Sequence, residues 1–133
     1  MNVGFGDPAI IADRTSNRVL VMSCAGNVSF QNGTRDVHQN VARFYSEDGG
    51  KTWSKPDDIA ESIYSQLDNS AFGPIRSMFI ASGVIYQSHH VKVGNYYRLY
   101  CAMLARTPSA THMNYVLYSD DFGGQWKILG DVN

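Results

Sequence analysis

The sequence predicts an all-β domain built from short antiparallel strands, and three observations support this prediction. Aromatic residues make up 12% of the 133 residues and glycine occurs 12 times. Glutamate, which is common on helix surfaces, occurs only at positions 47 and 61. Short apolar or alternating runs recur between groups of turn-forming residues, and one eight-residue pattern occurs twice.

The expected strands follow one another along the chain. They cover Pro8–Asp13, Arg18–Cys24, Val41–Ser46, Met78–Ala81, Val84–Ser88, Tyr96–Leu104 and Tyr115–Ser119. Residues 15–17 form a short polar loop between the first two strands. Ser82-Gly83 predicts a tight hairpin, and Val93-Gly94-Asn95 predicts another turn.

One stretch, residues 56–66, has a helical pattern. Ile59 and Ile63 stand four residues apart and therefore share one helix face. Asp57 and Asp58 stand where capping residues would begin the helix. We expect a helix of one or two turns inside a connection between strands.

The composition excludes several classes of protein. The 11 basic residues balance 12 acidic ones, so no strong positive field exists to attract nucleic acid or an anionic membrane surface. No apolar run approaches the roughly 20 residues of a membrane helix, and the N-terminus has no pattern of a secretory signal. The sequence therefore predicts neither a nucleic-acid partner nor a transmembrane segment.

The cysteines and histidines predict neither a metal site nor a disulfide framework, and the sequence leaves a single Cys24–Cys101 disulfide open. Cys24 and Cys101 are too few for a disulfide framework or a zinc ribbon, and we expect both to be buried free thiols. The four histidines show no metal-ligand spacing; they are His38, His89, His90 and His112. We therefore predict no metal site and no cofactor.

The repeated pattern is Ser-x-Asp-x-Gly-x-x-Trp, at residues 46–53 and again at residues 119–126. Its members are Ser46, Asp48, Gly50 and Trp53 in the first copy and Ser119, Asp121, Gly123 and Trp126 in the second. The aspartate can accept hydrogen bonds from the backbone of a turn, and the glycine permits a positive φ. The tryptophan is placed to pack against a neighbouring layer. We therefore expect a structural role for all eight residues.

These turns resemble the Asp-boxes, or BNR repeats, of sialidases. The stretches Gly6-Asp7-Pro8-Ala9 and Phe72-Gly73-Pro74 also resemble the beginnings of blades in bacterial sialidases. The resemblance implies part of a six-bladed β-propeller with four-stranded antiparallel blades. One blade would span about 1–70 with its Asp-box at 46–53, and the next about 71–133 with its Asp-box at 119–126.

The resemblance implies part of an exo-α-sialidase, which hydrolyses terminal sialic acids from glycoconjugates with retention of configuration. In that family a tyrosine is the nucleophile, a glutamate assists it, an aspartate is the acid/base and three arginines bind the substrate carboxylate. The sequence contexts of those groups are absent, and neither Glu47 nor Glu61 stands in the context of the catalytic glutamate. We nominate no catalytic residue and expect the isolated chain to be inactive. The alternative is a non-catalytic Asp-box propeller segment that binds carbohydrate or protein.

Three residues are candidates for substrate binding. The resemblance places Asp7 where an aspartate binds a hydroxyl of the sialic acid ring, although an aspartate before a proline is also a common turn residue. Arg76 could face the central channel or solvent, and Gln87 could line the pocket from an inner strand.

The expected partners are sialylated glycans, through the full-length domain, and the remaining blades. Two blades alone cannot close a ring, so an isolated chain is expected to self-associate. The parent family is usually secreted, periplasmic or on the cell surface.

Overall fold

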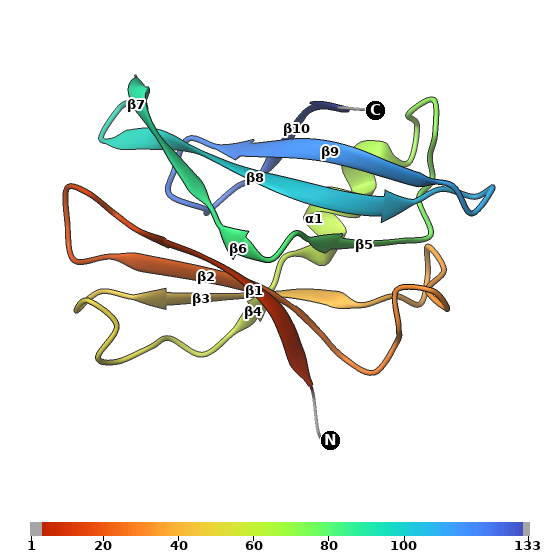
Figure 1. The fold of residues 1–133 in the computed structure, drawn as a ribbon, viewed down its shortest axis with the longest axis horizontal. Helices are drawn as coiled ribbons and strands as arrows, with labels where there is room; N and C mark the ends of the chain where they lie inside the picture. The colour runs from red at the N-terminus through yellow and green to blue at the C-terminus, as the bar shows by residue number, and fades with distance from the viewer. Residues whose placement is uncertain (1–3, 132–133) are drawn as a thin grey trace.

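The computed structural model describes residues 4–131, which form two β-sheets and one short helix (Figure 1). The strands are β1 (Phe5–Ala12), β2 (Val19–Ala25), β3 (Asn40–Ser46), β4 (Asp57–Asp58), β5 (Ser77–Ile80), β6 (Gly83–Val84), β7 (Tyr86–Val93), β8 (Tyr96–Arg106), β9 (His112–Ser119) and β10 (Lys127–Asp131). Helix α1 spans Ala60–Leu67. The all-β prediction is confirmed. The outermost residues of the two expected blades, 1–3 and 132–133, lie outside the described residues.

Each sheet is a meander with strands that follow one another along the chain. The first sheet has the order β4-β3-β2-β1-β6, and the second has the order β10-β9-β8-β5, with β7 also paired to β8. All pairs are antiparallel except β6, which runs parallel to β1. The two sheets lie one above the other in Figure 1, with the first sheet below.

The tight hairpin expected at Ser82-Gly83 is wrong. Strands β5 and β7 both pair with β8 and do not pair with each other. Between them, β6 crosses to the first sheet, where Val84 pairs with Ile10 and the Ile85 amide donates to the Ile10 carbonyl at 3.0 Å. The free edge of β1 therefore competes successfully with a local hairpin. The turn expected around Gly94 is confirmed, with a φ of 58° at that glycine.

Helix α1 begins later than the sequence predicts. Asp57 and Asp58 are not helix caps in the usual position; they form β4, which pairs with β3 at the outer edge of the first sheet. One Asp58 carboxylate oxygen accepts the amide of Val41 at 3.1 Å and the amide of Ala60 at 3.0 Å. The same side chain therefore ends β4 and starts the helix. No described helix is long and apolar enough to cross a membrane.

The core lies between the two sheets and is closed by the apolar face of α1. Strand β2 contributes Leu20 and Met22, and the central strands of the second sheet contribute Leu99 and Leu117. From the helix, the fully buried Ile63 joins the same cluster. Two sheets and a helix therefore share one continuous hydrophobic core.

The two repeated turns fold alike, each between the third and fourth strand of its meander. In the first, the Ser46 hydroxyl donates to Asp48 Oδ1 at 2.8 Å and accepts the Gly50 amide at 2.8 Å. In the second turn the same two contacts recur with the same lengths. The identical sequence offsets therefore encode one hydrogen-bond pattern.

The two tryptophans of these turns differ in burial. Trp126 is 3% exposed and belongs to the core between the sheets, as expected. Trp53 is 43% exposed, and its indole N–H donates to the Gly50 carbonyl at 3.0 Å. The expectation that Trp53 packs against a neighbouring layer is wrong for the described residues, because none of their layers covers this side of the first sheet.

The second turn docks onto the first sheet. Tyr45 of β3 donates its hydroxyl to the Phe122 carbonyl at 2.9 Å. The Arg43 guanidinium donates to the Gly123 carbonyl at 2.8 Å and to the next carbonyl at 2.7 Å. A Cβ on Gly123 would lie 2.4 Å from Leu20 Cδ2, and the φ there is +83°. Glycine is required here both by backbone conformation and by the closeness of the first sheet.

This contact can be tested with two glycines of matching backbone. Gly49 of the first turn has a φ of +73° and no atom near its would-be Cβ, whereas Gly123 meets Leu20. We expect Gly49→Ala to lower the free energy of unfolding by about 1–2 kcal/mol through backbone strain alone. Gly123→Ala should cost a further 1–3 kcal/mol, roughly the cost of overpacking. Urea unfolding measures both; equal losses would show that the close contact carries no energy.

The first turn predicts a measurable pKa. The Thr52 hydroxyl, the Thr52 amide and the Ser46 hydroxyl hold the pKa of Asp48 at about 2, from an ordinary value near 3.8. Because the folded pKa is lowered, this stabilisation is present above the unfolded value and is lost as the pH falls from about 4 to 2. We expect Thr52→Val to move the pKa of Asp48 upward in a carbon-detected NMR titration. Thr15→Val, in another exposed loop, should leave it unchanged.

Candidate functional site

Three loops lie at one end of the molecule, the end at which β1 and β5 begin: 26–39 after β2, 68–76 before β5 and 107–111 after β8. We call this end the strand-start end. Strands β1 and β6 are parallel and so run in the same direction. The loop 26–39 opens here, because Ala25 at the end of β2 pairs with Phe5 at the beginning of β1. The repeated turns lie at the other end, where Ser46 pairs with Val19.

Asp7 lies at the strand-start end in an unusual backbone conformation. Its φ is 48°, and the register of β1 against β2 shifts between Gly6 and Ala9. Such a bulge turns a side chain away from the regular alternation of a strand, and residues in the left-handed region cluster at functional sites. The Asp7 side chain is exposed, with the Cys24 thiol 3.6 Å from its Oδ2. The carboxylate is thus presented to solvent beside a thiol.

The two cysteines are free, as expected. Cys101 is buried, and burial raises the pKa of its thiol. Cys24 is only half-buried, which corrects the expectation for that residue: it is on the same side of β2 as Leu20 and Met22, but at the end of the sheet where the bulge at Asp7 lies. Burial and then the Asp7 charge raise the pKa of Cys24. Neither thiol is poised as a nucleophile at neutral pH.

Arg76 shares this end, and Gln87 does not. Arg76 is exposed directly before β5, with its amide bonded to the Arg106 carbonyl at 2.8 Å. Gln87 pairs with Leu99, seven residues from Arg106 along β8, which is about 23 Å at the rise of a strand. The structure therefore brings Asp7 and Arg76 to one end and places Gln87 toward the other.

The Gln87 side chain is buried in a link between the two sheets. Its Oε1 accepts the amide of Arg14 at 3.1 Å, and its Nε2 donates to Asp13 Oδ1 at 2.9 Å. The Arg14 guanidinium donates in return to the carbonyls of Gln87 and Ser88, at 3.1 and 2.8 Å. Both amide atoms of Gln87 therefore already have protein partners.

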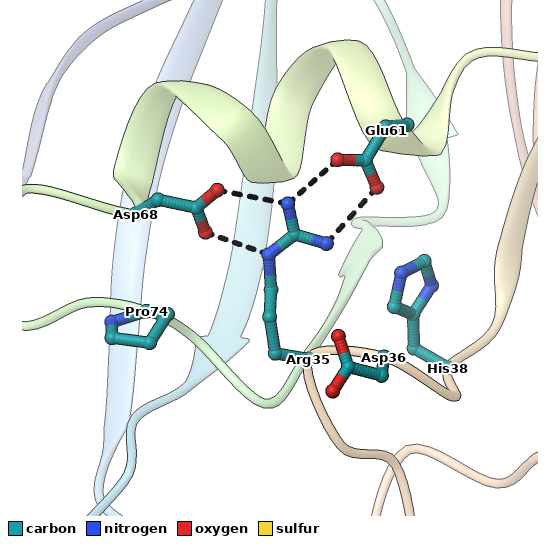
Figure 2. Close-up of a pocket in the computed structure, with 6 residues that line it drawn as sticks. All are labelled: Arg35, Asp36, His38, Glu61, Asp68 and Pro74. Atoms are coloured by element: carbon teal, nitrogen blue, oxygen red, sulfur yellow. Dashed lines mark hydrogen bonds and ion pairs between the residues drawn. The ribbon is translucent and has the colours of Figure 1, made fainter.

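A charged pocket of about 470 Å³ opens at the strand-start end (Figure 2). Its lining comes from the loop after β2, from α1 and from the segment before β5, and consists of Arg35, Asp36, His38, Glu61, Asp68 and Pro74. Arg35 lies at its centre: it forms a forked pair with Glu61, at 2.9 and 2.6 Å, and another with Asp68, at 2.6 and 2.9 Å. Arg35 thereby fastens the loop 26–39 to both ends of α1.

This network fixes the charge of the pocket. Hydrogen bonds from Arg35 lower the pKa of Glu61 and of Asp68, so both carboxylates are ionised at neutral pH and neither is a proton donor. Asp36 also lines the pocket, so its lining carries three carboxylates and one guanidinium. The pocket is therefore suited to hydroxyl or cationic groups rather than to an anion.

A tyrosine lies beside this pocket, but its hydroxyl faces away from solvent. The His38 ring stacks on the Tyr64 ring, with centroids 3.8 Å apart. The Tyr64 hydroxyl is fully buried and accepts the Met78 amide at 2.9 Å, and burial raises its pKa. Tyr64 is thus a core residue and is not placed as a nucleophile.

No sequence motif predicts this pocket. Arg35 is 26 residues from Glu61 and 33 from Asp68, and no motif links them. The sequence indicates only that two of the acidic residues lie together: Glu61 and Asp68 are seven residues apart, so on a helix they share one face. Among the residues that the structure describes, no group of three or more histidine, cysteine or acidic side chains could hold a metal ion.

Comparison with known proteins identifies the fold. No family model matches the chain, and no curated protein matches it in sequence. In structure it resembles the Hadza microbial sialidase Hz136, with a TM-score of 0.76 and 19% identity over 98% of this chain and 25% of that one. The chain therefore folds as a part of a sialidase-like β-propeller and spans a quarter of that sialidase, which confirms the predicted fold class.

The Arg35 network predicts a change in acidity. With Arg35→Met, which keeps the length of the side chain and removes its charge, the pKa values of Glu61 and Asp68 should both rise toward their ordinary values. Carbon-detected NMR titration of the two carboxylates measures this. Arg76→Met at the same end is the control, and it should leave both values in place. Unchanged values in Arg35→Met would mean that the ion pairs do not persist in solution.

Proposed function

We propose that this chain contributes two neighbouring blades to the propeller of a sialidase, and that its repeated turns are Asp-boxes. The single observation that supports this most is the structural likeness to a sialidase along almost the whole chain. The shared hydrogen-bond pattern of the two turns, at the end opposite to Asp7, agrees with a structural role for them. The substrate of such a protein would be terminal sialic acid on a glycan.

In this proposal the chain supplies substrate contacts and not the catalytic groups. Asp7 is the residue that would accept a hydrogen bond from a sugar hydroxyl, because its carboxylate is exposed on a bulge at the strand-start end. Arg76 is exposed at the same end. Both glutamates of the chain are paired with arginines, Glu47 with Arg18 at 3.0 Å and Glu61 with Arg35 at 2.6 Å. The nucleophile and its base would therefore come from other blades.

A chimera tests this proposal. Residues 4–131 would replace the matching quarter of the Hz136 sialidase, and release of a fluorophore from a sialic acid glycoside would be followed. We expect the chimera to hydrolyse the glycoside and the 133-residue chain alone to be inactive. Within the chimera, Asp7→Ala should lower kcat/KM by about tenfold or more, the loss of one good hydrogen bond to substrate.

Asp36→Ala is the matched control, because Asp36 is an exposed carboxylate at the same end that lines the Arg35 pocket instead. It should leave kcat/KM unchanged. The opposite order of effects would move the glycan to that pocket. A chimera that folds, by circular dichroism and by its unfolding midpoint, yet releases no fluorophore would favour the non-catalytic binding segment instead.

A further inference from the structure

The two sheets carry matching side chains at equivalent positions. The contact that joins them can therefore form again on the outer face of each sheet. Arg18 directly precedes the residue that pairs with Ser46, and Arg98 directly precedes the residue that pairs with Ser119. Each arginine forms an ion pair with the residue after that serine: Arg18 with Glu47 and Arg98 with Asp120. The sheets are thus equivalent in detail that the sequence pattern alone does not show.

The equivalence extends to the tyrosine that holds the docked turn. The Arg18 guanidinium lies 5.0 Å from the Tyr45 ring, and the Arg98 guanidinium lies 4.5 Å from the Tyr118 ring. Tyr45 donates its hydroxyl to the second turn. Tyr118 occupies the matching place on the second sheet, and residues 4–131 hold no third turn to dock there.

The faces away from the core are apolar in a matching way. Side chains alternate along a strand, so the face of the second sheet that repeats the core face of the first carries Tyr86, Tyr100, Ala102, Val116 and Tyr118. We call this set the tyrosine face. Tyr86 is 53% exposed, and its ring lies 6.2 Å from that of Tyr100. Ala102 stands where the fully buried Met22 stands in the first sheet, and it is exposed.

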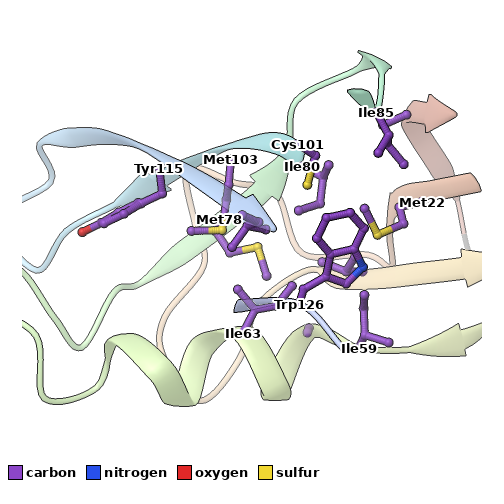
Figure 3. Packing of buried hydrophobic residues seen from close by; sticks show 14 of the residues in the cluster. Met22, Ile59, Ile63, Met78, Ile80, Ile85, Cys101, Met103, Tyr115 and Trp126 are labelled. Carbon is purple, nitrogen blue, oxygen red and sulfur yellow. The ribbon is translucent and has the colours of Figure 1, made fainter. Parts of the chain in front are cut away.

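The outer face of the first sheet is the complement. It carries Phe5, Val21, Phe44 and the exposed Trp53, which we call the tryptophan face. Trp53 is the equivalent of Trp126, which is buried within the cluster that holds Met22 and Ile59 (Figure 3). The internal contact therefore shows what each outer face would pack against. The tyrosine face would bind a repeated turn and its tryptophan, and the tryptophan face would bind a tyrosine face.

We propose that the 133-residue chain on its own binds a second copy head-to-tail. The turn 46–53 and the tryptophan face of the second copy lie on the tyrosine face of the first, the place that a neighbouring blade would take in the proposed propeller. A second copy carries both complementary faces, and each repeats one side of a contact that this chain already makes within itself. The contact is heterologous, since different surfaces of the two copies meet. Val116 stands where Arg43 stands, so two hydrogen bonds of the internal contact have no equivalent. The association is therefore weaker than the internal one and depends on concentration.

Two charged variants test the pairing of unlike faces. Ala102→Arg blocks the tyrosine face and Trp53→Arg blocks the tryptophan face, both at positions that are exposed in the single chain. Sedimentation of the wild-type chain should show a mass that rises with concentration above the single-chain 14.8 kDa. Each variant alone should remain at the mass of one chain. An equimolar mixture should give twice that mass and no more, because one unblocked pair of faces remains.

Ser65→Arg is the control, since it adds the same charge on the exposed side of α1; it should assemble as the wild type does. The proposal is overturned if the wild-type chain stays at 14.8 kDa up to its solubility limit, if Ala102→Arg assembles like the wild type, or if the mixture stays monomeric. If Trp53→Arg fails to fold, the tryptophan fluorescence of the wild-type chain tests the contact instead. Dilution should return Trp53 to water and shift its emission to longer wavelength, and an emission independent of concentration would overturn the proposal.

Discussion

The structure depends on the docking of one backbone turn against the neighbouring sheet. Three side chains of the first sheet meet the second turn: Arg43 and Tyr45 bind its carbonyls, and Leu20 packs against its glycine. Two of those carbonyls, of Phe122 and Gly123, take part in partly buried hydrogen bonds, so losing their partners would be costly. Because the turn is held, Trp126 is directed into the core, and the two sheets share one cluster instead of two small ones. The link through Gln87 joins the same two sheets at a second place, and helix α1 covers the core that they share.

The two ends of the molecule are built differently. The second repeated turn holds the two sheets together at one end, and both repeated turns make the same internal hydrogen bonds. The strand-start end is built differently, from longer loops, a helix and a bulge that presents Asp7. Loops on a rigid scaffold are where binding groups are usually found. The Arg35 network fits this difference, because it stiffens the loop 26–39 without using any of the repeated residues.

The sequence was informative where the structure is local. The alternation of β2 and the identical offsets of the two turns predicted the strands and the turn geometry, because both patterns act over a few residues. The path of β6 was not predictable in this way: the choice of Val84 between a local hairpin and the edge of β1 depends on a strand more than 70 residues away. The same holds for the pocket around Arg35, whose partners come from a distant helix. Asp7 could be nominated from the sequence because its Asp-Pro step is a local signal, whereas the link through Gln87 joins distant residues and has no such signal.

The parallel pairing of β6 with β1 has a consequence for how the chain folds. The hairpins β1–β2 and β8–β9 join near neighbours, but the links between sheets join residues 73 to 81 positions apart. Ordering so long an intervening segment costs entropy before any of those links forms. Local hairpins are therefore expected to form early and the union of the sheets late, and chains dominated by such distant pairings fold slowly. Until β6 pairs with β1, the edge of β1 is unpaired. The chain is therefore most prone to aggregation late in folding, when nearly complete sheets still expose this edge.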